Sequence, residues 1–149
     1  MKRMPILFFL LSLLVMSAPS PSASQMPQPQ KPDDKPTFKV LGTFTNRYKI
    51  ANKYILVAPK LSDDELIKLA KKLHHKEPDV TFWFLDDDSQ FSQLLKSLKE
   101  IEAGNTGSFP QAWAKQHIIA NLQPWYASGR GTYWVLCKGD GIDKIVEIE

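Results

Sequence analysis

The chain has 149 residues, of which 43% are hydrophobic and 11% aromatic, and it contains one cysteine. This composition is typical of one globular domain, and a single cysteine excludes an internal disulfide framework and a cysteine-rich zinc site. The 19 basic and 16 acidic residues give a net charge of +3. Because the two signs are interspersed, the sequence argues against a nucleic-acid-binding surface, which needs basic charge gathered on one face.

The N-terminus has the pattern of a secretory signal peptide. Lys2 and Arg3 precede a strongly apolar stretch from Ile6 to Met16, which small residues and prolines follow as far as Ser24. This apolar stretch is too short for a membrane-spanning helix, which needs about 20 residues. We therefore expect residues 1–24 to be removed and the mature chain, without a transmembrane span, to be periplasmic or extracellular.

A proline-rich segment follows the leader. Six of the 11 prolines fall between Pro19 and Pro36, together with several glutamines. Such a composition cannot build an apolar core. The sequence therefore predicts a Pro/Gln-rich flexible tether over residues 25–36 and a globular domain over residues 37–149.

The first half of the domain predicts two strands and a helix. Residues 38–45 and 54–58 are rich in β-branched and aromatic side chains, which favours a β-hairpin. Ser62 and Glu65 have the spacing of a capping box, so a helix should begin at Asp63. The helix should end near residue 76 because Pro78 forbids its continuation.

The second half predicts a strand, a helix and three further strands. Residues 79–85 have apolar side chains on both faces, which indicates a strand inside a sheet. An apolar stripe from Phe91 to Ile101 predicts the helix, with a second capping box between Asp87 and Gln90 and a stop at Gly104. A short helical turn at residues 110–115 comes next, and the remaining strands are expected at 117–123, 133–137 and 142–148.

These elements give the order β-β-α-β-α-β-β-β. The expected fold class is α+β, a single small domain with one mixed β-sheet and two main helices. We expect both helices to pack largely on one face of that sheet.

Asp86 and Asp88 are the first candidates for catalysis. They end an apolar strand as Asp-x-Asp, which resembles the first motif of the haloacid dehalogenase phosphatases. The resemblance implies that one carboxylate attacks phosphate and that both help to hold magnesium. The chain departs from the family pattern at Gln90, where the family has Thr or Val. Carboxylates at a helix start are also explained by capping and the helix dipole, and we favour that interpretation.

His117 is the third catalytic candidate. It would act as a general base only if an acid or a nucleophile lay within hydrogen-bond reach; the alternative is a strand-end histidine with satisfied hydrogen bonds. The sequence contains no nucleophile elbow, phosphate-binding loop or H-E-x-x-H motif. It therefore predicts no cofactor and no resident metal.

Trp125, Tyr126 and Arg130 are the candidate binding residues. They lie beside a glycine-containing loop and could form an exposed aromatic patch for a sugar, peptide or protein, although tryptophans also fill cores. We therefore expect an exported, non-catalytic domain that binds a protein or a cell-envelope component. The alternative is a metal-dependent phosphoester hydrolase that uses Asp86 and Asp88.

Overall fold

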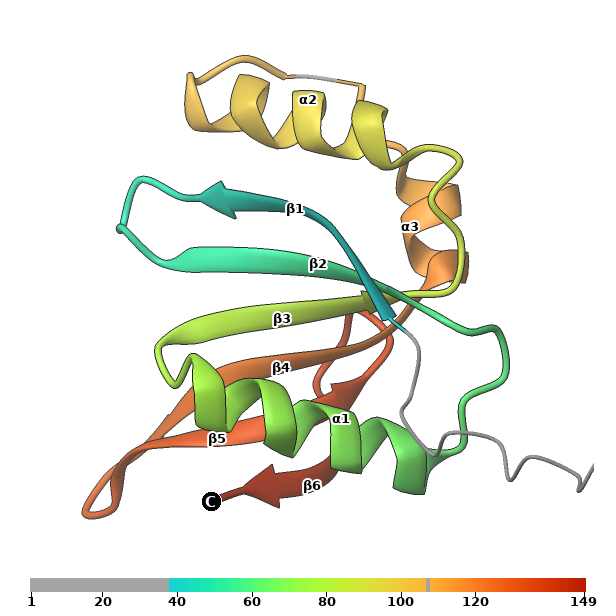
Figure 1. Ribbon diagram of the computed structural model, residues 1–149. Coiled ribbons are helices and arrows are strands. Elements are labelled where there is room, and N and C mark those ends of the chain that lie inside the picture. The colour runs from blue at the N-terminus through green and yellow to red at the C-terminus, as the bar shows by residue number, and fades with distance from the viewer. Residues whose placement is uncertain (1–37, 107) are drawn as a thin grey trace, which may run out of the picture. The chain divides into compact units, whose positions relative to one another are not determined.

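The computed structural model describes residues 38–106 and 108–149, so the predicted signal peptide and tether lie outside it (Figure 1). The described residues form six strands in one mixed sheet and three helices, which confirms the α+β class. The bounds are β1 Phe38–Thr45, β2 Ala51–Val57, α1 Asp63–Lys76, β3 Val80–Leu85, α2 Phe91–Glu102, α3 Gln111–His117, β4 Ile118–Ala127, β5 Gly131–Lys138 and β6 Asp143–Ile148.

The six strands lie side by side in chain order, from β1 at one edge to β6 at the other. Only β2 and β3 are parallel, and α1 makes the crossover that a parallel pair requires. The other neighbours are antiparallel. The expected hairpins at the two ends of the chain, β1–β2 and β5–β6, are both present.

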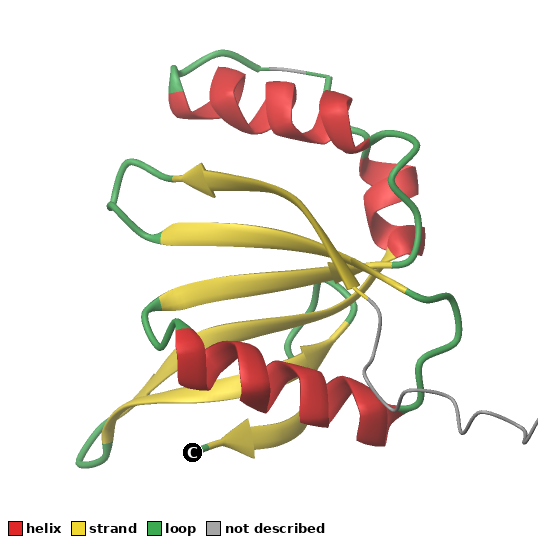
Figure 2. Ribbon diagram, viewed as in Figure 1, coloured by secondary structure: helices red, strands yellow, loops and turns green. Residues whose placement is uncertain are grey.

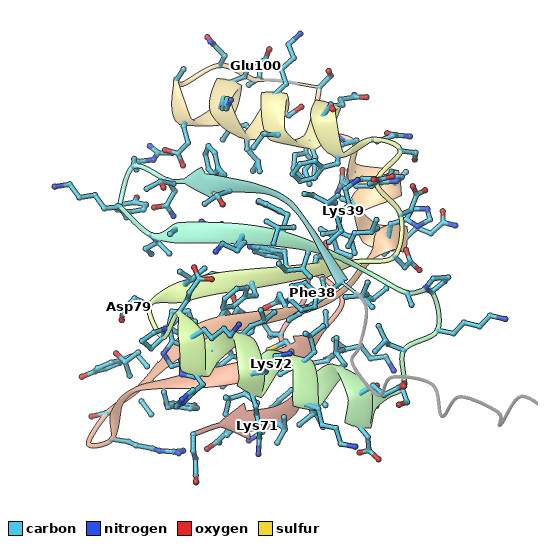
Figure 3. All side chains as sticks on the ribbon, viewed as in Figure 1. Phe38, Lys39, Lys71, Lys72, Asp79 and Glu100 are labelled. Atoms are coloured by element: carbon cyan, nitrogen blue, oxygen red, sulfur yellow. The ribbon has the colours of Figure 1, made fainter. Side chains whose placement is uncertain are left out.

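Helix α1 begins where its capping box predicts. The Glu65 backbone N–H donates to Ser62 Oγ over 3.4 Å, and the Ser62 N–H donates to Glu65 Oε2 over 2.9 Å. Its buried residues recur at three- and four-residue steps. They are Leu66, Leu69, Ala70 and Leu73. Lys71 and Lys72 lie exposed on the outer side of the helix, away from this stripe (Figure 3).

The helices cover both faces of the sheet, so the expectation that the main helices share one face is wrong. On one face, α1 packs over a core that includes Ile55 and Phe84. On the other, α2 and α3 pack over Tyr54, Leu85 and Ile118. Figure 2 shows α1 in front of the lower strands and α2 with α3 at the opposite end of the sheet. The physical reason is that β2 and β3 are apolar on both faces, and each apolar face has to be buried.

The start of α2 also differs from the prediction. Gln90 occupies the N-cap position without a side-chain cap, so the expected Asp87–Gln90 capping box does not form. The Asp87 carboxylate instead accepts the Ser89 backbone N–H over 2.6 Å, because an aspartate readily accepts the N–H two residues ahead in an Asx turn. The stop at Gly104 is confirmed, since its positive φ, 84°, suits glycine.

The fourth strand is longer than predicted and contains Pro124. A central strand donates backbone N–H groups to a neighbouring strand on each side, and proline has no N–H to donate. The pairing of β4 with β3 ends at Leu122, and beyond it β4 pairs only with β5. The missing N–H of Pro124 therefore leaves no neighbouring strand without a donor, and the strand continues to Ala127.

We expect the partly buried His74 to make the stability of the domain depend on pH. Its ring lies 4.8 Å from the Trp134 ring, and burial lowers its pKa below the ordinary 6.5, although the charge of Asp79 opposes the shift. A folded-state pKa below the unfolded one gives stability that is full above pH 6.5 and is lost as the pH falls through the folded value. In urea unfolding, the wild type should lose more stability between pH 7.5 and pH 5 than His74→Phe. The exposed His75→Phe should behave as the wild type, and equal pH dependence in all three proteins would contradict this prediction.

Candidate functional site

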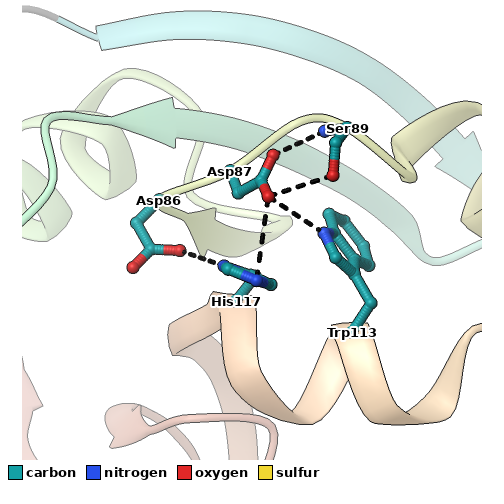
Figure 4. Close-up of polar contacts among 5 residues, drawn as sticks. All are labelled: Asp86, Asp87, Ser89, Trp113 and His117. Atoms are coloured by element: carbon teal, nitrogen blue, oxygen red, sulfur yellow. Dashed lines mark hydrogen bonds and ion pairs between the residues drawn. The ribbon is translucent and has the colours of Figure 1, made fainter.

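The structure brings Asp86 and His117 together. Strands β3 and β4 pair Leu85 with Ile118, so the residue after β3 and the residue before β4 face each other at the end of the ladder. The Asp86 backbone N–H donates to the His117 carbonyl over 3.2 Å. Asp86 Oδ1 lies 2.8 Å from His117 Nδ1, and both side chains are half-buried (Figure 4).

Asp87 closes the other side of the His117 ring and was not among the predicted candidates. Its Oδ2 lies 3.7 Å from His117 Nε2 and accepts a hydrogen bond from Trp113 Nε1 over 3.4 Å. Hydrogen bonds from Ser89 hold the pKa of the Asp87 carboxyl below its ordinary value. The four-residue spacing of Trp113 and His117 on α3 was the signal that both share one helix face.

The side chains of this cluster are paired with one another. Asp86 Oδ1 lies within hydrogen-bond distance of His117 Nδ1, whereas the 3.7 Å between Asp87 Oδ2 and His117 Nε2 is an ion-pair distance too long for a hydrogen bond. The nearby hydroxyl of Ser89 already donates to Asp87 over 3.0 Å. Together these contacts hold the loop after β3 against the end of α3.

Asp88, the remaining catalytic candidate, does not join the cluster. It is exposed, and its Oδ2 lies 3.5 Å from Lys39 Nζ on β1. Among the described residues, no three His, Cys, Asp or Glu side chains lie close enough together to hold a metal ion. The two carboxylates that the phosphatase resemblance joins, Asp86 and Asp88, therefore have separate partners.

The second candidate site lies at the far end of the β4–β5 hairpin. Trp125 stands opposite Tyr133 in the ladder, and their rings meet edge to face with centroids 6.4 Å apart. The Arg130 guanidinium lies 4.4 Å from the Tyr133 ring centroid, and Arg130 Nη1 lies 2.7 Å from Glu147 Oε2. We call Trp125, Arg130, Tyr133 and Glu147 the aromatic hairpin surface.

The charged residues at the aromatic hairpin surface form ion pairs with Glu147. A hydrogen bond from Lys144 and another from Arg130 lower the pKa of the Glu147 carboxyl, so Glu147 stays ionised at neutral pH. Lys144 Nζ lies 3.0 Å from Glu147 Oε1. Neither apolar core includes a residue of this surface.

Tyr126, the remaining predicted binding residue, lies apart from this surface. It follows Trp125 in β4, and successive side chains of a strand point to opposite faces of the sheet. Tyr126 is 78% exposed. Tyr133 and Glu147, which were not among the predicted residues, belong to the aromatic hairpin surface instead. The hairpin register could have revealed Tyr133, because a tight turn at residues 128–130 pairs it with Trp125.

None of the helices in the described part of the chain has the length and apolar character that crossing a membrane requires. Comparison of the chain with protein-family models, with curated proteins and with solved structures finds no match.

Proposed function

We propose that the chain is an exported, non-catalytic domain that binds a protein or a cell-envelope component through the aromatic hairpin surface. The observation that carries the proposal is the stacking of Arg130 on Tyr133 beside Trp125, with Glu147 as its anchor. Trp, Tyr and Arg are the residues that most often dominate binding energy at protein interfaces. The leader-like N-terminus supports the exported location.

The contacts within this surface favour tight binding because they form before a partner arrives. Ordering a long side chain such as arginine on binding costs about 0.5–1.5 kcal/mol. Arg130 already has two partners in the free chain, Tyr133 and Glu147, so less of this cost remains.

A protein partner fits better than a glycan. A sugar ring binds by stacking on an open aromatic face, and the Arg130 guanidinium covers one face of Tyr133. The mixed charges of Arg130, Lys144 and Glu147 beside the rings resemble the polar rim that surrounds the centre of a protein interface. We therefore favour a protein of the cell envelope as the partner.

The test is a capture experiment with protein expressed from the full-length sequence. Envelope proteins retained by the wild type should be lost with Trp125→Ala or Arg130→Ala. With the purified partner, each change should raise the dissociation constant about 30-fold, which corresponds to a loss of roughly 2 kcal/mol of binding free energy. Tyr126→Ala should have little effect, since Tyr126 lies on the other face.

The chain offers a matched control at the opposite edge of the sheet, in the β1–β2 turn. Arg47 lies 5.8 Å from the Tyr48 ring centroid and forms an ion pair with Glu102 over 3.2 Å. Arg47→Ala and Tyr48→Ala should leave capture unchanged. Equal losses at both places would refute the assignment. Phosphoester hydrolysis that needs Mg²⁺ and is lost in Asp86→Asn would instead establish the hydrolase alternative.

A further inference from the structure

A cavity of about 240 Å³ lies between the sheet, α2 and α3, and none of its lining residues belongs to the two clusters described above. Tyr54 and Trp83 of the sheet and Leu94 and Leu98 of α2 line it, and Phe109 lies on the loop before α3. These walls are apolar and aromatic, as is usual for small-molecule sites. An apolar cavity of about 150 Å³ is large enough to bind benzene. This one has room for a body of about two fused rings.

Asp140 is the acidic residue among those that line the cavity. It lies in the β5–β6 turn and lines the cavity, and it has no ion-pair partner among the described residues. An exposed carboxylate beside apolar walls favours a ligand with a positive charge.

The fold holds Asp140 in this place. The fully buried Asn121 donates from Nδ2 to the carbonyls of Gly139 over 2.9 Å and Gly141 over 3.2 Å. These two glycines stand on either side of Asp140. A buried side chain therefore holds the backbone on either side of Asp140.

The aromatic residues of the cavity favour a cation as well. The rings of Tyr54 and Trp83 are stacked with centroids 6.3 Å apart. Aromatic faces attract cations. Burial raises the pKa of the Tyr54 hydroxyl, so this group remains protonated at neutral pH. An amine-bearing ligand would meet an acidic residue and aromatic residues in the lining of one site.

We propose that this cavity binds a small organic cation, a compact apolar or aromatic body of up to two rings that carries an amine. Its apolar body lies between α2 and the sheet, and its amine faces Asp140. This site is separate from the aromatic hairpin surface, so either can fail without the other.

Three probes of similar size and different charge test the proposal. Tryptamine is a cation, indole is neutral and indole-3-acetate is an anion at neutral pH. Calorimetric titration of the full chain should find tryptamine the tightest and indole-3-acetate the weakest. Asp140→Asn should lower the affinity for tryptamine about fivefold and leave the affinity for indole unchanged, as expected for one partly exposed charge pair. Asp143→Asn, an exposed change on the same hairpin outside the cavity, should alter neither.

Nuclear magnetic resonance of the wild type locates the binding site without any variant. The indole N–H signal of Trp83 should shift on titration with tryptamine, and that of Trp125 should not. Leu98→Trp, which fills the cavity, should abolish the shift. Absence of binding by all three probes, equal affinity for tryptamine and indole-3-acetate, or a shift at Trp125 alone would overturn the proposal.

Discussion

Asn121→Asp should destabilise the domain by about 3–5 kcal/mol, the range for an uncompensated buried charge. The change replaces one NH₂ group by oxygen. Asn121 is fully buried, and its Nδ2 is the donor to both turn carbonyls, Gly139 and Gly141. The new carboxylate would face two carbonyl oxygens and could donate to neither. Chemical denaturation at pH 7 measures the loss, which should shrink at pH 4 as the carboxyl takes up a proton.

Asn46→Asp is the matched control for that substitution. Asn46 acts as an acceptor, since its Oδ1 receives the backbone N–H groups of Tyr48 and Ile50, each over 3.0 Å. A carboxylate accepts these hydrogen bonds as well as an amide does, so the stability should change by less than about 0.5 kcal/mol. If the two substitutions cost the same, the donor role of Asn121 does not determine its effect.

Phe84→Ala should lower the free energy of unfolding by about 3–5 kcal/mol. Phe84 lies on β3 and is fully buried in the core that α1 covers. Removal of its ring takes away apolar burial and leaves a cavity in a close-packed interior. Since whole domains are stable by only about 5–15 kcal/mol, the melting temperature should fall by more than about 10 °C.

Phe109→Ala is the same chemical change at a partly exposed position. Phe109 lies on the loop before α3 and is 38% exposed. The loss of stability should therefore stay below about 1.5 kcal/mol. Thermal unfolding of the two variants side by side measures the difference. Similar melting temperatures would mean that the α1 face contributes no more than this loop.

Local patterns predicted the elements and the two terminal hairpins well, but they did not predict which face of the sheet each helix covers. The capping box at Ser62 and the glycine at 104 act within a few residues of chain, so the sequence alone reveals them. The face that α2 covers depends on the whole sheet. The apolar residues on both sides of β3 were a local sign that each face of the sheet had to be covered.

The candidate sites show the same division. Asp86 and His117 were both predicted as candidates, but their contact depends on the pairing of β3 with β4, which one sequence does not reveal. Asp87 was overlooked because the sequence pattern assigned it to a helix cap. The alternation of β4 could have separated Trp125 from Tyr126, because a strand directs neighbouring side chains to opposite faces.

The chain-order sheet has a consequence for folding kinetics. Every strand pairs with the strand before it in the sequence, so the ends brought together at each step are separated by one connection only. The entropy lost on loop closure grows with loop length, and domains rich in local contacts fold faster than those built from distant pairings. The sheet can therefore grow by one strand at a time, and no step requires the two edges, β1 and β6, to meet.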